Sequence, residues 1–257
     1  MNEKIKGELP EWVYTKGEYN LCLSDDLDSL WSCYYLTKYR GWPIKYFYNF
    51  YSIYKEAGTT VEKNCIAIDM DICNGKCLSN HVTDNKNPDC INLNRYCNVS
   101  RWNYTRKYAG STLLMVMSIL DIDINSFTDE QKAILLCVDS TYLHYKFDKK
   151  LASYYIGEIF QYPELIYILE QHDQEYFIDL QIKYNLKGKI YMDDWNLIST
   201  DIKLKELSQL FDIDLDIPQR DYEKIGKFEI HTGVPQQDTK IFSLAWSYKN
   251  SAIYSTY

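Results

Sequence analysis

The hydrophobic pattern near the start of the chain switches from strand to helix. Tyr19–Leu23 is an apolar run of strand length, and Ser29–Tyr39 carries apolar residues at helical spacing until Gly41 and Pro43 end the pattern. The acidic turn Asp25–Asp28 stands between the two segments. The pattern therefore predicts a strand, an acidic turn and a helix in succession.

Two further apolar segments of strand length follow, Ile44–Phe50 and Cys65–Ile68, and the second ends at the acidic residues Asp69 and Asp71. Strands that alternate with helices are typical of a parallel sheet with crossover connections. In such sheets, ligands bind beyond the carboxyl ends of the strands. Both acidic clusters are predicted to lie at such ends.

Residues 74–103 are rich in Asn, Asp, Gly and Pro, which predicts a long irregular region with one short apolar piece at Ile91–Leu93. Loops of this length are uncommon unless they serve a function. The apolar run Leu113–Leu120 that follows predicts a buried helix, with Ser111 or Thr112 as its N-cap.

The second half of the chain has a mainly helical pattern up to about residue 186. A helix is predicted from Thr128 to Asp139, and helical spacing continues from Lys149 to Leu180. Beyond residue 186 the predicted elements are short, one helix and three strands: Leu204–Leu210, Phe228–Ile230, Ile241–Trp246 and Ala252–Tyr257. We predict an α/β fold with a mostly parallel sheet flanked by helices, organised as a domain of residues 1–186 and a smaller C-terminal α+β lobe of residues 187–257.

Composition narrows the class of protein. Apolar residues make up 46% of the chain and charged residues 25%, which suits a globular protein with a sizeable core. The net charge of −8 argues against a general attraction to nucleic acid or to an anionic membrane. No apolar stretch approaches the ~20 residues of a membrane span, and residues 1–6 lack the apolar core of a signal peptide.

We therefore expect a cytoplasmic protein with no membrane partner, whose eight cysteines are mostly reduced. The wealth of Tyr, Asn and Lys would suit a phage or mobile-element protein.

Carboxylates that converge at strand ends repel one another and generally need a cation to hold them together. Asp26 and Asp28, two residues apart in a tight turn, can face one site, and oxygen-rich sites suit magnesium or manganese. An added histidine shifts the preference toward manganese or another transition metal. Taken alone, the same turn is explained equally well as a solvated acidic loop or a helix N-cap.

The order of the polar residues favours the metal interpretation. Four acidic or histidine-containing pieces follow one another along the chain: Ser24-Asp25-Asp26-Leu27-Asp28-Ser29, Asp69, Ser79-Asn80-His81 and Asp139-Ser140-Thr141. Residues 19–141 thereby resemble the N-terminal domain of the DHH phosphoesterase family, which carries an Asp-x-Asp turn, a lone Asp, an Asp-His-His triplet and a later Asp. The third piece differs, because Ser79-Asn80-His81 stands in place of the triplet.

The resemblance implies roles for particular residues. It implies metal ligands at five positions, Asp26, Asp28, Asp69, His81 and Asp139, with Asp69 and His81 also taking part in catalysis. In that family, two manganese ions activate a water for attack on a phosphodiester or pyrophosphate, and paired ions stabilise both the attacking and the leaving oxygen. The small-residue segment ending in Ser111 and Thr112 resembles a helix start of that family, which implies substrate binding because helix N-termini hold phosphate.

Basic and aromatic residues concentrate in one segment, Arg95–Lys107. Arg106 and the other arginines suit bidentate contacts with phosphate, and Trp102 and Tyr104 can stack on bases. We expect Arg106 to bind substrate, and a nucleotide, another small phosphorylated ligand or a short single-stranded nucleic acid to be the partner. A basic surface patch explains the segment equally well.

A second metal interpretation uses softer ligands, because a structural zinc could be held by residues from this set: Cys73, Cys77, His81, Cys90 and Cys97. Their spacing is wider than the Cys-x2-Cys of common zinc modules. Its alternative is that the cysteines are ordinary thiols. This interpretation competes with the first for His81.

Two other residues have alternative interpretations. Asp71 competes with Asp69 for the second motif, and His144, five residues past Asp139, is expected on a helix surface, with orientation of a substrate as the alternative. The functional hypothesis is a manganese- or magnesium-dependent phosphoesterase. The alternative is a catalytically inactive DHH-like fold that binds a nucleotide or a protein. The sequence specifies neither the substrate nor an oligomeric state.

Overall fold

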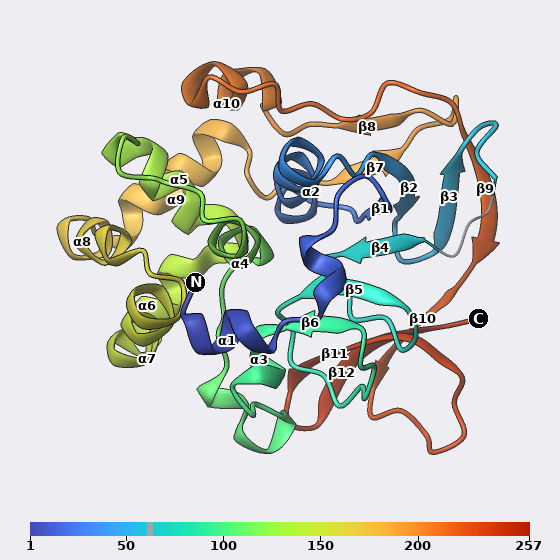
Figure 1. Ribbon diagram of the computed structural model, residues 1–257, viewed down its shortest axis with the longest axis horizontal. Helices are drawn as coiled ribbons and strands as arrows, with labels where there is room; N and C mark the ends of the chain where they lie inside the picture. Colours follow the sequence, from blue (N-terminus) through green and yellow to red (C-terminus); the bar gives the residue numbers. More distant parts are fainter. Residues whose placement is uncertain (61–63) are drawn as a thin grey trace.

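A computed structural model describes residues 1–60 and 64–257. It is an α/β fold in which a mostly parallel sheet has helices on one face and a smaller antiparallel sheet on the other (Figure 1). The strands of the large sheet are, in spatial order, β6 (Cys90–Asn92), β5 (Lys76–Ser79), β4 (Cys65–Ile68), β1 (Asn20–Leu23), β2 (Ile44–Tyr48), β3 (Ser52–Glu56) and β9 (Tyr222–Lys227). The predicted fold class is confirmed.

The direction in which strands are added to the sheet reverses beside β1. β1 pairs in parallel with β2 on one side and with β4 on the other, and β5 and β6 continue the parallel arrangement beyond β4. β3 and β9 follow β2 as antiparallel strands. The carboxyl ends of β1 and β4 therefore flank a topological switch point, where open α/β sheets form their ligand crevice.

Alternate side chains of the strands enter two separate cores, because successive side chains of a strand point to opposite faces. Leu21 and Leu23 of β1 belong to the large core on the helical side. Cys22, between them, packs on the other side with Met70 and Ile72 of the loop that follows β4. This loop covers the face of the sheet that carries no helix.

Helices are present in every segment where the pattern predicted one, and others, such as those at residues 3–8 and 93–96, were not predicted. The α-helices of the described chain are α1 (Glu3–Glu8), α2 (Leu27–Arg40), α3 (Leu93–Tyr96), α4 (Thr112–Ile119), α5 (Asp129–Cys137), α6 (Thr141–Phe147), α7 (Lys149–Ser153), α8 (Pro163–Gln171), α9 (Gln174–Tyr184) and α10 (Leu204–Phe211). Shorter 3-10 or π turns are η1 (Glu11–Tyr14), η2 (Arg101–Arg106), η3 (Val138–Ser140) and η4 (Tyr154–Ile159). None of these helices combines the length and apolar character that crossing a bilayer requires.

Helices α2 and α4 position the crevice. Asp26 caps α2 and Gly41, with φ of 73°, ends it in the left-handed conformation that glycine adopts at little cost. Ser111 caps α4, as one of the two predicted N-caps, by accepting the N–H of Leu114 at 3.2 Å. The helices contact each other, and α4 is buried along its whole length. α4 is thus a core helix whose N-terminus reaches the sheet.

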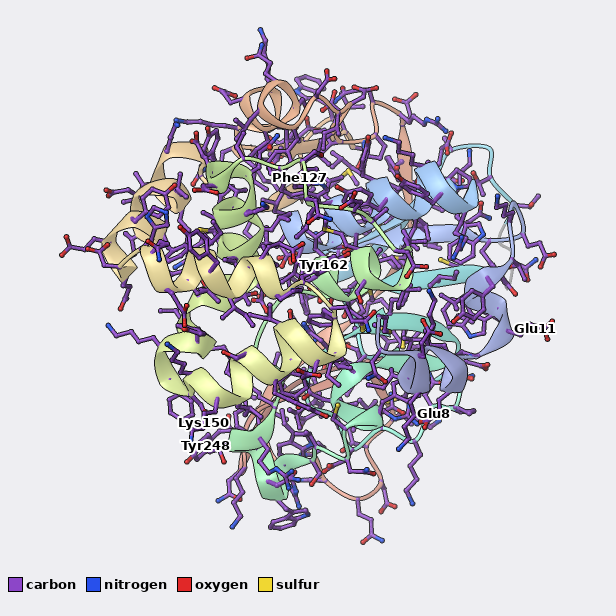
Figure 2. All side chains as sticks on the ribbon, turned by 60° about the vertical axis from the view of Figure 1, so that its left-hand side comes forward. Glu8, Glu11, Phe127, Lys150, Tyr162 and Tyr248 are labelled. Carbon is purple, nitrogen blue, oxygen red and sulfur yellow. The ribbon has the colours of Figure 1, made fainter. Side chains whose placement is uncertain are left out.

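Side chains fill the space between the helices and the sheet (Figure 2). Tyr162 lies in the middle of this view and is buried, with its hydroxyl donating to the carbonyl of Ile122 at 3.0 Å. The charged side chains of Glu11 and Lys150 lie at the periphery. This distribution follows from the cost of burying charge compared with burying a ring.

The chain after residue 186 contributes to the large sheet and also forms smaller ones. The hairpin β7 (Ile190–Met192) and β8 (Ile198–Thr200) precedes α10 and β9, and β9 pairs with β3. A three-stranded antiparallel sheet follows, in the order β10 (Glu229–Gly233), β12 (Ser251–Thr256) and β11 (Ile241–Tyr248). The predicted short helix and three strands of this region are all present.

The pattern missed three strands of the large sheet, β3, β5 and β9. β5 lies inside the region that was expected to be irregular, because it is short and stands between Gly75 and polar residues. β3 follows β2 through a tight turn and mixes polar with aromatic residues. The helix predicted to reach Asp139 ends at Cys137, because Asp139 and Ser140 adopt positive φ angles of 47° and 57°.

A substitution at Gly110, just before α4, can test how tightly this region is packed. A Cβ atom here would overlap the Tyr108 ring and lie 2.7 Å from Thr141 Oγ1. We predict that Gly110→Ala lowers the free energy of unfolding by about 1–3 kcal/mol, the usual cost of overpacking. Urea denaturation measures it. Gly7→Ala is the matched control, since a Cβ there meets nothing within 4 Å, and equal stability of the two variants would contradict the prediction.

Candidate functional site

The acidic turn after β1 is tied to the end of β4 by a serine. The Ser29 hydroxyl donates to the carbonyl of Ile68 at 3.0 Å and accepts the N–H of Ser24 at 2.8 Å. The backbone N–H of Ser29 donates to Asp26 Oδ1 at 3.2 Å, so Asp26 is the N-cap of α2. Ser29 thus holds the turn beside Asp69, the residue that follows Ile68.

Asp28 is buried and faces the N-terminus of α4. Its two carboxylate oxygens accept the backbone N–H groups of Thr112 at 2.7 Å and Leu113 at 2.6 Å. The first amides of a helix have no partner within the helix, and the helix dipole favours a negative charge there. Asp28 therefore links α2 to α4, and the exposed fraction of the residue is only 4%.

Asp69 and Asp28 share a hydrogen-bond donor residue, Thr112. The Thr112 hydroxyl donates to Asp69 Oδ1 at 2.7 Å, while the Thr112 N–H donates to Asp28. Asp69 has a φ of 59°, in the left-handed region that costs energy for a residue other than glycine. Such strained conformations occur often at functional sites.

His81 is held in place by Asp71. His81 Nδ1 donates to Asp71 Oδ2 at 3.0 Å, and the same carboxylate accepts the Ser79 hydroxyl at 2.6 Å and the Asn92 amide at 2.7 Å. The Asp71 side chain has no exposed area. A carboxylate on one ring nitrogen fixes the tautomer and the orientation of an imidazole. The other nitrogen, Nε2, lies 3.9 Å from Asp69 Oδ1.

Ser79 and Asn80, the first two residues of the predicted third motif, have structural partners. Ser79 donates to Asp71, as described above. The buried Asn80 amide donates to the carbonyl of Gly110, and the Asn80 carbonyl accepts the amide of Asn94. Ser79 therefore supports the Asp71–His81 pair, and Asn80 supports the loop before α4.

Asp139 reaches the same region from the end of α5. Its left-handed backbone, followed by that of Ser140, breaks the helix and leaves the carboxylate without a hydrogen bond to any residue of ranges 1–60 and 64–257. Asp139 lines three adjoining cavities. It is the carboxylate of the cluster that a ligand could reach most easily.

Burial and mutual repulsion raise the pKa values of these acids. Burial, followed by the charges of Asp69 and Asp139, raises the pKa of Asp28 well above its usual range. Burial raises the pKa of Asp69 to about 7, against the opposing charge of His81. Asp139 is exposed at the cavities it lines, but partial loss of solvent around its carboxylate raises the pKa to about 6, against the opposing charge of His81. The cluster therefore favours a bound proton or cation at neutral pH.

Two lysines from distant segments approach the carboxylates. Lys189 Nζ lies 3.2 Å from Asp25 Oδ1 and 3.7 Å from Asp26 Oδ2. The backbone N–H of Ile190 donates to the carbonyl of Asp25 at 2.8 Å, so the chain after α9 is fastened to the acidic turn. Lys107 lines two of the three cavities, and its charge, like that of Lys189, lowers the pKa of Asp139 after the stronger effects of burial and His81.

The three cavities have different walls. The site cavity, of about 360 Å³, lies between Asp69, His81 and Asp139 on one side and β11 and β12 on the other. The lysine cavity, of about 280 Å³, includes Asp26, Asp28 and Lys189. The aromatic cavity, of about 400 Å³, lies between Lys107 and α6. Asp139 is common to all three, so a single ligand could extend from one into another.

The donor set fits a hard divalent cation by its chemistry, since it combines carboxylates with one imidazole. Within residues 1–60 and 64–257, no group of three or more His, Cys, Asp or Glu side chains is arranged so that it could hold a metal ion. A cation would have to compete with the Thr112 hydroxyl for Asp69 and with the α4 amides for Asp28. Asp139 is free of such competition.

Ser111, Thr112 and Arg106, the residues expected to bind phosphate, do not lie together. Ser111 and Thr112 are buried, and their hydroxyls are used by Leu114 and Asp69. Arg106 is exposed and lines none of the three cavities, whereas its neighbour Lys107 lines two. Within the segment Arg95–Lys107, the basic residue that lines the cavities beside the carboxylates is thus Lys107.

The softer candidate ligands do not gather around His81. Cys77 and Cys90 are paired in register on β5 and β6 and are buried in the smaller core. His81 instead uses Nδ1 for Asp71. All eight cysteines are free thiols, and the structural zinc stays a prediction without a supporting arrangement.

His144 corrects an expectation. It was expected on a helix surface, but its exposed fraction is 5%, because α6 packs it beneath the segment before α4. The backbone N–H of Ala109 donates to His144 Nδ1 at 3.4 Å. Burial lowers the pKa of His144 to about 4, so the ring is neutral at neutral pH. Sequence spacing could not reveal this, because the contact joins residues 35 positions apart.

Comparison with known proteins adds no relative: no family model, no curated protein and no solved structure matches the chain. The resemblance to the DHH family therefore rests on the order of residues in the sequence and stays a prediction.

The Asp71 contact can be tested through the pKa of His81. Burial lowers this pKa, but the opposing effect of Asp69 and Asp71 is larger and raises it to about 10. We predict that Asp71→Asn lowers the pKa of His81 by about 1–3, the usual effect of removing one opposite charge. An NMR titration of the ring measures it, with Asp84→Asn as the control.

The same pair predicts a pH dependence of stability. The pKa of His81 is higher in the folded protein than its ordinary value of 6.5. The stabilisation is therefore complete below pH 6.5 and is lost as the pH rises toward 10. Wild type should lose more stability than Asp71→Asn across this interval, and parallel pH profiles would contradict the role given to Asp71.

Proposed function

We propose that the protein is a divalent-cation-dependent phosphoesterase that hydrolyses a phosphodiester or pyrophosphate bond in a nucleotide or another small phosphorylated molecule. The observation that carries the proposal is the convergence of Asp28, Asp69 and Asp139 at the topological switch point of the sheet. Carboxylates placed together in this position would repel a phosphate anion unless a cation lay between them.

The residues that would hold the cation are the oxygen donors of this cluster, Asp26, Asp28, Asp69 and Asp139. Manganese or magnesium would supply Lewis-acid activation of a water and neutralise charge on the phosphoryl oxygens. His81 is placed beside these donors with its Nε2 toward Asp69. A cation bound to His81 would have to displace a proton, because only the neutral ring ligates metal.

The chain's own residues would then bind and orient the substrate. His81, which Asp69 and Asp71 keep protonated at neutral pH, can donate from Nε2 to a phosphoryl or leaving-group oxygen. Lys107, at the rim of the site cavity, adds a positive charge for phosphate. β11 and β12 form the opposite wall of that cavity and exclude water from the bound group.

A second candidate is a fold that binds such a ligand without hydrolysing it. The contacts of Asp28 with two backbone amides and of Asp69 with Thr112 favour it, because they occupy oxygens that a cation would need. Ser79 and Asn80 also have structural partners only. In this case ligand binding would survive chelation of divalent metal.

The two candidates differ in the behaviour of Asp139→Asn. For the phosphoesterase, we predict that manganese raises the melting temperature of wild type but not of the variant. Turnover of a panel of dinucleotides, cyclic dinucleotides and pyrophosphate should fall at least about 100-fold, since even second-shell changes at metal sites cost 10–100-fold. The exposed Asp194→Asn, outside all three cavities, is the control for loss of one charge.

The outcome that would overturn hydrolysis is an absence of turnover by wild type with manganese or magnesium. Turnover that is equal in wild type and Asp139→Asn would also overturn it. Ligand binding that persists in a chelator, with the ligand recovered intact, would establish the second candidate instead.

A further inference from the structure

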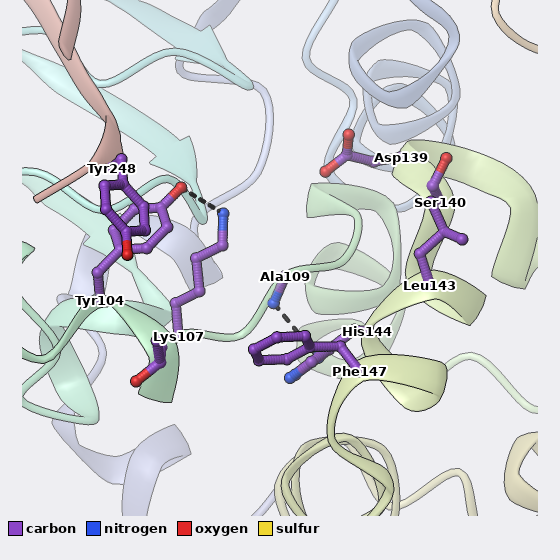
Figure 3. A pocket seen from close by; sticks show the side chains of 10 residues that line it. Tyr104, Lys107, Ala109, Asp139, Ser140, Leu143, His144, Phe147 and Tyr248 are labelled. Carbon is purple, nitrogen blue, oxygen red and sulfur yellow. Dashed lines mark hydrogen bonds between the residues drawn. The ribbon is translucent and has the colours of Figure 1, made fainter. Parts of the chain in front are cut away.

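The aromatic cavity, whose walls include residues of η2, α6 and β11, is lined chiefly by apolar atoms. Figure 3 shows Tyr104 and Tyr248 on one wall and Leu143 and Phe147 of α6 on the other. The ring centroids of Tyr104 and Tyr248 lie 5.7 Å apart in an edge-to-face arrangement. A volume of about 400 Å³ is in the range of small-molecule sites.

The aromatic rings at this cavity are unusually exposed. Phe147 has an exposed fraction of 73% and Tyr248 of 62%. Exposed aromatic rings on both walls of the cavity offer faces on which a planar ring can stack, and such stacking accepts any of the nucleobases. The apolar area that a ligand ring would cover here is therefore already in place.

The cavity also contains a buried donor without a partner. His144 lines it, and the residue is 5% exposed. Nδ1 accepts the N–H of Ala109, so the proton of the neutral ring is on Nε2. No described residue forms a hydrogen bond with Nε2. A buried donor in this state costs free energy until an acceptor is supplied.

Charge is arranged at one end of the cavity. Lys107 Nζ donates from its position over the Tyr104 ring to the Tyr104 hydroxyl at 2.7 Å. Lys107 and Asp139 line both the aromatic cavity and the site cavity. A ligand with an apolar ring at one end and a phosphoryl group at the other would match this sequence of surfaces.

We propose that the aromatic cavity binds the base of a nucleotide substrate, with the attached phosphoryl group at Lys107 and Asp139. The assignment rests on the proposed function, which places the phosphoryl chemistry at Asp139. A nucleobase combines a planar ring for the faces of Phe147 and Tyr248 with ring nitrogen or carbonyl acceptors for His144 Nε2. An aliphatic group would fill the volume but leave that donor unpaired.

The probes are the four common nucleoside monophosphates and ribose 5-phosphate, which has the phosphate and sugar without a base. Calorimetry with full-length protein and manganese should show that at least one monophosphate binds more tightly than ribose 5-phosphate. Phe147→Ala should weaken its binding about 5- to 150-fold, as expected for the loss of one stacking ring. Binding of ribose 5-phosphate should stay within about twofold of wild type.

A second variant tests the donor. His144→Asn keeps an acceptor for the Ala109 N–H and removes the donor at Nε2. It should reduce the preference among the four bases and weaken the best one about 2- to 12-fold, which corresponds to one hydrogen bond. A merely structural role for His144 would change the affinity for all ligands equally. Tyr167→Ala, an exposed aromatic on α8, is the matched control for Phe147→Ala.

The outcomes separate this assignment from the proposed function. Equal affinity for ribose 5-phosphate and all monophosphates, or nucleotide binding unchanged in Phe147→Ala, would overturn the base-binding cavity even if Asp139→Asn abolished hydrolysis. Conversely, base-dependent binding that Phe147→Ala weakens, with no hydrolysis by wild type, would support the cavity and overturn the phosphoesterase. Because Phe147 is exposed, its variant keeps the test decisive even if His144→Asn fails to fold.

Discussion

The contact between Asp28 and the first amides of α4 is the interaction on which the site depends. It joins α2, which follows β1, to the buried helix α4. The contact lies at the point beside β1 where the direction of strand addition reverses. Each of these two hydrogen bonds contributes about 0.5–3 kcal/mol, the upper part of the range applying to the ionised carboxylate. Because Thr112 also donates to Asp69, the same helix end sets the distance between the two acidic strand ends.

That arrangement brings acidic side chains close together, so their charges must be balanced by nearby cationic groups. Three acids lie close together, two of them largely buried, and the nearest balancing groups come from remote parts of the chain: His81 after β5, Lys107 before α4 and Lys189 after α9. Asp71 holds the imidazole and has no contact with solvent. The balance between carboxylates and basic side chains is consequently established only when the protein folds. A bound metal cation would add positive charge to it.

The C-terminal sheet completes the surroundings of this charge cluster. β11 forms backbone bridges with the loops after β4 and β5, at Ile72 with Ser243 and at Val82 with Trp246. The Arg101 guanidinium lies 4.5 Å from the Trp102 ring and 4.4 Å from the Trp246 ring, which fastens β11 to the basic segment. These contacts close one side of the site cavity and bring Tyr248 opposite α6.

The sequence by itself determined the α/β class, the strand before the acidic turn, the start of α4 to within one residue and the last three strands, because these depend on local periodicity and capping. It also indicated that Asp26, Asp28, Asp69 and Asp139 would be placed at element ends. Only the tertiary structure decided which partners these residues have. Asp71 at His81, Lys189 at the acidic turn and the buried His144 all depend on contacts between segments that local patterns do not relate.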